Sequence, residues 1–311
     1  MRNISLRRRF AFFALIVIPA LFASNNVAAR FADGIVPPTA LAFWRCAFTS
    51  VLLMPFVGAS VLAKRSELRS ELPHILVLGL IGMGMVSIAT YAGARTTTAS
   101  NIGLIYASTP AIILVLDWAF TGIRLSRHQL GGLMLCVAGI AFIVLRGDMR
   151  TLVDARFSTG DLVVCAGTVG WALYSVLLKY WPTRLTVVER AAVIAAAGAL
   201  ATLPIAIVES HGVAGVAPGW QGLGIVMTVG VLAGAALIPS HAFVTAELGP
   251  RIAVVLLYLI PLYNIMLAWL LLDEALEPFQ AAGGVLVLIG IFLASRSRPA
   301  SPPSAAAGAS R

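Results

Sequence analysis

The stretch "LDEALEPFQAAGG", Leu272 to Gly284, lies between two apolar runs and carries three carboxylates, one proline and no base. The earlier stretch "TGIRLSRHQLGG", Thr121 to Gly132, carries three basic residues and no carboxylate. The two stretches share residues at a constant offset of 151 positions: Leu125 and Leu276, Gln129 and Gln280, and Gly132 and Gly283. One chain therefore contains the same connector twice, once basic and once acidic.

The composition indicates an integral membrane protein. The 311 residues are 59% hydrophobic and only 11% charged, with a mean hydropathy of +0.94. A soluble domain is roughly half apolar and a quarter charged, so a soluble chain of this kind would lack the polar surface to cover its core. The net charge of +9 comes from short basic clusters between apolar runs. Such clusters are typical of loops that face anionic lipid headgroups, and they do not indicate nucleic acid.

Ten apolar runs are long enough to cross a bilayer as helices, which takes about 20 residues each. They cover residues 10–30, 39–61, 74–94, 98–120, 128–146, 160–180, 187–208, 222–244, 252–272 and 280–295. The connectors are short and leave no room for a soluble domain. Residues 297–311, "SRPASPPSAAAGASR", lack large apolar side chains and predict a disordered tail.

The basic residues predict the orientation of the chain. Residues 7–9, all arginine, precede the first apolar run in the manner of a signal peptide, but the length of that run and the nine further spans favour an uncleaved first helix. With the N-terminus inside and the spans alternating, fifteen Lys and Arg residues fall in inside segments and five in outside segments. The positive-inside rule then predicts that both termini are cytoplasmic.

The shared connector belongs to a longer internal repeat. Between Pro110 and Ile140, nine of thirty-one positions are identical to the residue found 151 positions later. We therefore expect a first five-helix repeat at 1–150, a second at 151–296 and a cytoplasmic tail at 297–311. Because five is odd, the second repeat enters the membrane from the opposite side. The basic connector would then face the cytoplasm, where bases are retained, and the acidic one would face outward.

Several segments resemble a known family. They are "LAFWRCAF" in the second span, "ASNIGLIYASTPAIILVLDWAF" in the fourth, "GGLMLCVAGIAFIV", "GWALYSVLLKY" and "IAVVLLYLIPLYNIMLAWLLLDEALEPFQAAGGVLVLIGI". Together they resemble the drug/metabolite transporter superfamily, in particular its EamA-type ten-helix exporters, over residues 10 to 295. The segments "ASNNVAAR" and "YAGARTTTAS" look most like bacterial aromatic amino-acid exporters of the YddG type. The resemblance implies a multi-pass exporter in the bacterial cytoplasmic (inner) membrane.

Inverted repeats themselves favour transport, because two homologous bundles enclose a site near the bilayer midplane and rock about it. With the resemblance, they predict export of small metabolites, most simply amino acids with an aromatic or branched apolar side chain. The mechanism expected is alternating access as a uniporter or exchanger. Two alternatives stay open: a non-transporting membrane protein, either an intramembrane enzyme or a sensor, and a proton-coupled drug exporter. The expected partners are the substrate and membrane lipid, with a monomeric chain.

Polar and aromatic residues on otherwise apolar spans are the candidate lining of the substrate cavity. They are Asn25, Ser87, Tyr91, Asn101, Tyr106, Trp171, Tyr174, His241, Tyr258 and Tyr263. Each has a plainer reading as core packing or as a hydrogen bond between helices. Pro110 and Pro261 occupy matched places in the fourth and ninth spans and are the candidate hinges, because a proline frees a backbone carbonyl and can kink a helix.

Two arginines, Arg45 and Arg190, lie within spans near their ends. Either could hold a substrate carboxylate bidentately. Snorkelling to the outer surface is an equal alternative for Arg45, and an interfacial charge near the cytoplasm is the alternative for Arg190. The expected lining therefore carries no fixed charge at mid-depth, and the carboxylates are expected almost entirely in loops.

The sequence gives no support to an enzyme. It has no HExxH, no P-loop GxxxxGK[ST] and no CxxC, so no cofactor or metal is expected. Ser240 and His241 are adjacent, which places them about 100° apart on a helix and unable to act as a nucleophile–base pair by themselves.

Overall fold

The computed structural model describes residues 6–122, 125–148, 158–248 and 255–295, and every regular element in that part is helical. The helices are α1 (Leu6–Phe31), α2 (Pro38–Ala63), α3 (Arg65–Leu78), η1 (Gly79–Met85), α4 (Val86–Gly93), α5 (Ala99–Tyr106), α6 (Thr109–Thr121), α7 (Arg127–Val144), α9 (Thr159–Tyr180), α10 (Val187–Glu209), α11 (Val213–Val216), α12 (Gly219–Met227), η2 (Thr228–Ala236), α13 (Leu237–Leu248), α15 (Val255–Leu272) and α16 (Pro278–Ser295). The predicted boundary at 150/151 and the predicted tail 297–311 lie outside the described residues.

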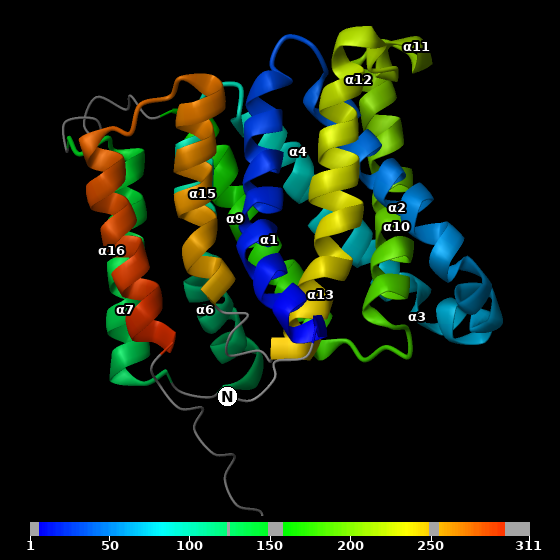
Figure 1. The fold of residues 1–311 in the computed structure, drawn as a ribbon, viewed down its shortest axis with the longest axis horizontal. Helices are drawn as coiled ribbons and strands as arrows, with labels where there is room; N and C mark the ends of the chain where they lie inside the picture. The colour runs from blue at the N-terminus through cyan, green and yellow to red at the C-terminus, as the bar shows by residue number, and fades with distance from the viewer. Residues whose placement is uncertain (1–5, 123–124, 149–157, 249–254, 296–311) are drawn as a thin grey trace, which may run out of the picture.

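The ten predicted spans are confirmed. Eight helical stretches are long and apolar enough to cross a membrane, and two shorter apolar helices, Leu259–Leu272 and Pro278–Ala294, complete the set. In lipid only a helix satisfies every backbone N–H and C=O within one segment, so these apolar runs can cross only as helices. Figure 1 shows them as near-parallel rods that run up and down through one bundle. We call the end where α1 begins the proximal face and the opposite end the distal face.

The packing of the helices follows the repeat. α7 packs along α16, and α2 packs along α10. Each of these pairs joins a helix to its counterpart in the other repeat. The remaining contacts occur in matched sets: α1 lies against α15 as α9 lies against α5 and α6, and α10 lies against η1 as α2 lies against η2. This exchange of partners is what a two-fold relation between two five-helix units of opposite direction produces.

Glycines on α7 and α16 let the backbones of that pair touch. A Cβ added at Gly139 would stand 2.7 Å from the carbonyl oxygen of Gly283, and one added at Gly283 would stand 2.8 Å from that of Gly139. Gly132 and Gly290 face each other in the same way. Small residues at such interfaces allow close backbone approach, which drives helix association where lipid removes the hydrophobic force.

The matched glutamines of the two connectors, Gln129 and Gln280, make the same local contact. The side-chain Oε1 of Gln129 accepts from the backbone N–H of Ser126, and that of Gln280 accepts from the backbone N–H of Glu277, both at 2.9 Å. Each glutamine thus folds back over the first turn of its helix, where backbone N–H groups have no partner within the helix. The shared pattern of the two connectors therefore encodes a helix start followed by a close helix–helix contact.

Two π-helical segments interrupt matched spans and were not predicted. η1 lies in the third span between α3 and α4, and η2 lies in the eighth between α12 and α13. Both are rich in small residues, and neighbours occupy the missing volume: the ring of Tyr174 packs onto Gly82, and Phe48 packs onto Gly230. π-helical turns are rare and occur frequently at functional sites.

The two candidate hinge prolines lie in different local structures. The fourth span is broken after Tyr106, and Pro110 sits in the first turn of the new helix α6, where its missing N–H costs nothing. Pro261 lies inside the continuous helix α15. The matched positions are therefore not matched kinks, and a hinge role for either proline stays a prediction.

The α7–α16 contact can be tested with a pair of glycines on one helix. Gly139→Ala places a methyl group against backbone atoms that cannot move aside, so we expect a destabilisation of about 1–3 kcal/mol. Gly131→Ala is the control, because nothing lies within 4 Å of that position. Thermal unfolding of the detergent-purified variants measures both. Equal melting temperatures for the two variants would show that the close contact is not formed.

Candidate functional site

A cavity of about 340 Å³ opens at the distal end of the bundle between α1, α2, α4 and α10. Its lining consists of Ala29, Ala32, Asp33, Gly34, Ile35, Val36, Pro37, Pro38, Leu41, Tyr91, Arg95 and Glu209. Leu41 and Tyr91 are almost fully buried and form its inner wall. The charges at its mouth are engaged: Arg95 pairs with Asp33 at 3.4 Å, and Glu209 accepts from Thr39.

Four predicted lining residues converge beneath this cavity. The hydroxyl of Tyr91 donates to Oδ1 of Asn25 at 2.9 Å, which joins α4 to α1. One residue before Tyr91, the Thr90 hydroxyl bonds to that of Tyr106 at 2.7 Å. One turn further into the bundle, Ser87 is fully buried and carries the next polar group of α4.

Arg45 occupies the same layer and corrects one expectation. Its Nη1 donates to the Ser87 hydroxyl at 2.5 Å, so the side chain points across the bundle from α2 to α4. Of the two alternatives for Arg45, snorkelling to the outer surface is wrong, because the guanidinium binds an internal hydroxyl. The absence of a fixed charge from the substrate lining stays a prediction.

The remaining lining candidates lie elsewhere. Trp171 and Tyr174 form a tilted ring pair with centroids 5.1 Å apart, in a core cluster that surrounds Cys46 and Leu177. His241 on α13 is exposed. Tyr263 is partly buried on α15, while the side chain of Tyr258 lies outside the described residues. The structure thus does not bring all ten candidates into one pocket, and their contact with a substrate stays a prediction.

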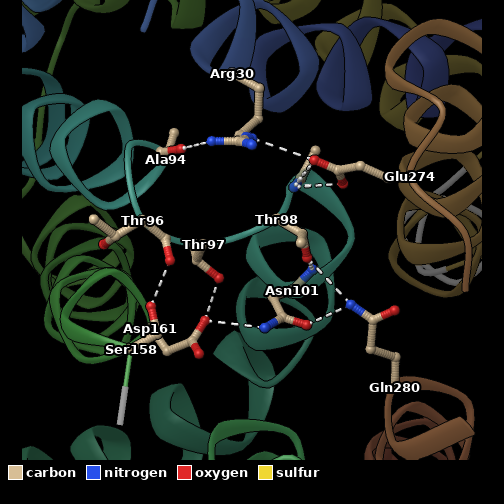
Figure 2. Close-up of polar contacts among 11 residues, drawn as sticks. Arg30, Ala94, Thr96, Thr97, Thr98, Asn101, Ser158, Asp161, Glu274 and Gln280 are labelled. Carbon is tan, nitrogen blue, oxygen red and sulfur yellow. Dashed lines mark hydrogen bonds and ion pairs between the residues drawn. The ribbon is translucent and has the colours of Figure 1, made fainter. Parts of the chain in front are cut away.

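Asn101 belongs to a polar network at the distal end of the bundle, shown in Figure 2. Its Nδ2 donates to Oδ1 of Asp161 at 3.1 Å, and its Oδ1 accepts from Gln280 at 2.7 Å. Gln280 also donates to the Thr98 hydroxyl at 3.1 Å. Thr97 donates to Asp161, whose side chain is 0% exposed and whose Oδ2 has no partner among the described residues. The network joins α5, α9 and α16.

Arg30 and Glu274 extend this network to α1 and to the α15–α16 connector. Nε of Arg30 lies 3.2 Å from Oε1 of Glu274, and its Nη1 donates to the carbonyl of Ala94 at 2.7 Å. Glu274 also accepts from the backbone N–H of Ala99 at 3.0 Å, where the positive end of α5 favours a carboxylate. Figure 2 shows Arg30 between these two partners. We call the Arg30–Glu274 pair and its Ala99 contact the distal clamp.

Ion pairs also join helices at the proximal face. Lys64 pairs with Glu189 at 2.7 Å between the C-terminus of α2 and the start of α10, and Lys179 pairs with Asp117 at 2.6 Å between α9 and α6. Arg190, the second arginine considered from the sequence, donates to the backbone carbonyls of Leu178 and Trp181. That side chain therefore caps the C-terminal end of α9.

The expectation that carboxylates lie almost entirely in loops is also wrong. Asp161 and Glu189 are buried in the first turns of α9 and α10. The spacings from Ser158 to Asp161 and from Thr186 to Glu189 are those of a helix start, and Thr186 and Glu189 do form a capping box. This signal was available in the sequence, but the partners across the bundle were not. Within the described ranges no group of three or more His, Cys, Asp or Glu side chains could hold a metal ion.

The profile of the EamA-like transporter family matches the chain twice, at residues 9–145 and 158–296. The chain belongs to the EamA-like transporter family. The double match places one family unit in each half, which agrees with the internal repeat. The chain is therefore a multi-pass membrane transporter and does not belong to an enzyme family.

Relatives of this EamA-like protein align over most of its length. A probable terminal-alkyne amino-acid exporter of Streptantibioticus cattleyicolor is 28% identical over 286 residues, which is 92% of this chain and 93% of that protein. An uncharacterized transporter of Archaeoglobus fulgidus is 27% identical over 82% of this chain and 87% of its own length. A crystal structure with 21% sequence identity matches 93% of this chain and 98% of its own with a TM-score of 0.57, which supports the fold alone.

The distal clamp predicts a local change when one carboxylate is neutralised. Glu274→Gln keeps an acceptor near Ala99 but removes the ion pair with Arg30, so we expect faster amide exchange at residues 94–101. Hydrogen–deuterium exchange by mass spectrometry measures it. Asp117→Asn is the control, since it removes an ion pair at the opposite face. Exchange that is unchanged in Glu274→Gln, or equally increased in both variants, would contradict a role for the clamp in holding this region.

Proposed function

We propose that this EamA-like transporter exports small metabolites, specifically amino acids with an aromatic or branched apolar side chain, from the bacterial cytoplasm. The observation that carries the proposal is the alignment over nearly the whole chain with a probable amino-acid exporter. The cavity fits this substrate class, because Leu41 and Tyr91 offer apolar surface and neighbouring Asn25 offers an amide. Flat apolar contact discriminates by only about 1–3 kcal/mol per methylene, so several side chains would be accepted.

Alternating access is the proposed mechanism, with the proximal face in the cytoplasm. The distal clamp and the network around Asp161 tie α1, α5, α9 and α16 together at one end. The pairs Lys64–Glu189 and Lys179–Asp117 tie helices at the other end. Opening one face would release one set of polar contacts while the other set stays formed. Such exchange lets two rocking repeats expose the same cavity to each side in turn.

The proposed transport mode is uniport or exchange, which needs no coupling ion. Proton-coupled export is the second candidate. The second is favoured by one observation: Asp161 is fully buried, and its Oδ2 has no partner among the described residues. Buried carboxylates within spans are typical of proton pathways. A drug-like substrate coupled to protons would use the same fold.

Flux measurements on purified protein in liposomes separate these readings. We expect counterflow of labelled phenylalanine and leucine, at similar rates with and without a pH gradient, and no flux in protein-free liposomes. Acceleration by an imposed gradient that disappears in Asp161→Asn would favour proton coupling instead. The absence of flux for every amino acid tested would overturn the proposed substrate class.

Trp171 and Tyr174 form an aromatic layer outside the cavity, and Trp171 tests whether the proposed path includes that layer. We expect Trp171→Ala to reduce transport of aromatic and branched amino acids by about tenfold, because an indole in such a layer offers a large apolar contact area and one donor. Trp269→Ala serves as the control, since Trp269 is 63% exposed on the outside of the bundle. Size-exclusion profiles check that both variants stay folded. Wild-type transport by the first variant would restrict the substrate to the cavity at Tyr91.

A further inference from the structure

The guanidinium of Arg45 is incompletely satisfied inside the bundle. Arg45 lies seven residues after Pro38, the first residue of α2, which is about 10 Å along the helix axis. One of its donors, Nη1, binds Ser87 on α4. Nε is buried and has no hydrogen-bond partner among the described residues. A buried unmade hydrogen bond of a charged group is costly, so its presence calls for a partner that binds there.

No described carboxylate neutralises this charge. Salt bridges within the described ranges pair Arg30, Lys64, Arg95, Lys179 and Arg184 with acidic partners, and Arg45 is in none of them. Asp161, the buried carboxylate of the distal network, is bound to Thr97 and Asn101. Its side-chain hydrogen-bond partner in the described part of the chain is a neutral hydroxyl, that of Ser87. An arginine within a membrane span that lacks a paired anion marks a substrate or ion pathway.

The cavity ends one helical turn short of this arginine. Leu41 and Tyr91 form its inner wall, and they stand four residues from Arg45 on α2 and four residues from Ser87 on α4. Residues four apart on a helix lie on one face, about 6 Å apart along the axis. The Arg45–Ser87 layer is therefore the next layer inward, and a molecule in the cavity would meet it once Leu41 and Tyr91 move aside.

The free edge of the guanidinium has the geometry of a carboxylate receptor. Because Nη1 is used by Ser87, the Nε and Nη2 donors remain side by side on the opposite edge. Two parallel N–H donors match the two oxygens of a carboxylate, and such bidentate contacts add both energy and orientation. We propose that Arg45 binds the carboxylate of the transported molecule through this edge, and that the rings and aliphatic groups of the cavity hold its apolar part.

Arg190 provides a matched comparison within the same chain. It is the other arginine within a span, but two backbone carbonyls satisfy its guanidinium, Leu178 at 3.0 Å and Trp181 at 3.2 Å. Both of its Nη atoms therefore have backbone partners in the folded protein, whereas Arg45 has one hydroxyl partner and a buried Nε without one. The hydrogen-bond contacts thus distinguish Arg190, which caps a helix, from Arg45, which has a donor left for a ligand.

This inference rests on the proposed function for its amino-acid substrate but not for its chemistry. The experiment compares L-phenylalanine, L-phenylalaninamide, which lacks the carboxylate, and 3-phenylpropionate, which lacks the amine. Thermal stabilisation of the detergent-purified protein reports binding, and counterflow in liposomes reports transport. We expect both carboxylates to stabilise the wild type and the amide to bind about 10- to 100-fold more weakly, as loss of a charge-assisted contact predicts.

Three variants decide the role of Arg45. Arg45→Gln should bind the acid and the amide equally, and Arg45→Lys should recover part of the preference, because it keeps the charge without the planar fork. Arg190→Gln should lower the melting temperature yet keep the preference for carboxylates. Without ligand, Arg45→Met should melt at or above the wild-type temperature, since it removes a charge that has no partner.

The outcomes are distinguishable from failure of the proposed function. Stabilisation by 3-phenylpropionate that is lost in Arg45→Gln, without transport of any amino acid, would support the arginine site and overturn the amino-acid substrate. Equal transport of phenylalanine and its amide by the wild type would overturn the arginine site and leave amino-acid export standing. Failure of both Arg45→Gln and Arg45→Met to fold would show that Arg45 is structural and would also overturn the inference.

Discussion

Polar groups inside this bundle must find their partners within the protein, and this constraint organises the whole structure. Lipid offers no hydrogen bonds, so the backbone is helical in all ten spans and the ion pairs of buried or half-buried side chains gather at the two ends. One polar pair between helices uses both of its amides: Nδ2 of Asn26 donates to Oδ1 of Asn264 at 2.8 Å, and Asn264 donates to the carbonyl of Ile260. Such contacts between membrane helices contribute about 0.6 kcal/mol on average, so they fix which helices meet more than they stabilise the fold.

The same constraint explains why the two π-helical segments matter for the site. A π turn leaves a backbone carbonyl poorly paired, and η1 shows one use of this: the hydroxyl of Ser87 and the thiol of Cys46 both donate to the carbonyl of Met83. Ser87 is in turn the partner of Arg45. The irregular backbone of the third span thereby orients the hydroxyl that holds the arginine across the bundle.

Much of the fold was predictable from the sequence, because span length and the 151-residue offset are properties of the sequence itself. The site was less predictable for reasons that are also physical. Position 45 is compatible with a side chain that reaches outward or inward, and only the presence of Ser87 on the neighbouring helix decides between them. Asp161 has the spacing of an ordinary helix start, and its burial depends on Thr97 and Asn101 arriving from another span. The π segments depend on contacts such as Phe48 against Gly230, which join different repeats.

The two connectors share the same helix start but make different contacts beyond it. Gln129 and Gln280 close the first turn of their helices in the same way, and the glycines that follow bring those helices together. Only Gln280 then uses its amide nitrogen to reach Thr98 and Asn101. Only the acidic connector supplies Glu274, which meets Arg30 and the start of α5. The difference in charge between the connectors therefore reflects these contacts as well as the side of the membrane that each connector faces. The acidic connector takes part in the polar contacts at the distal end. The glycines that both connectors share still hold α7 against α16. Inverted repeats that are alike in their packing but unlike in their end contacts are what a transporter needs if its two faces are to open under different conditions.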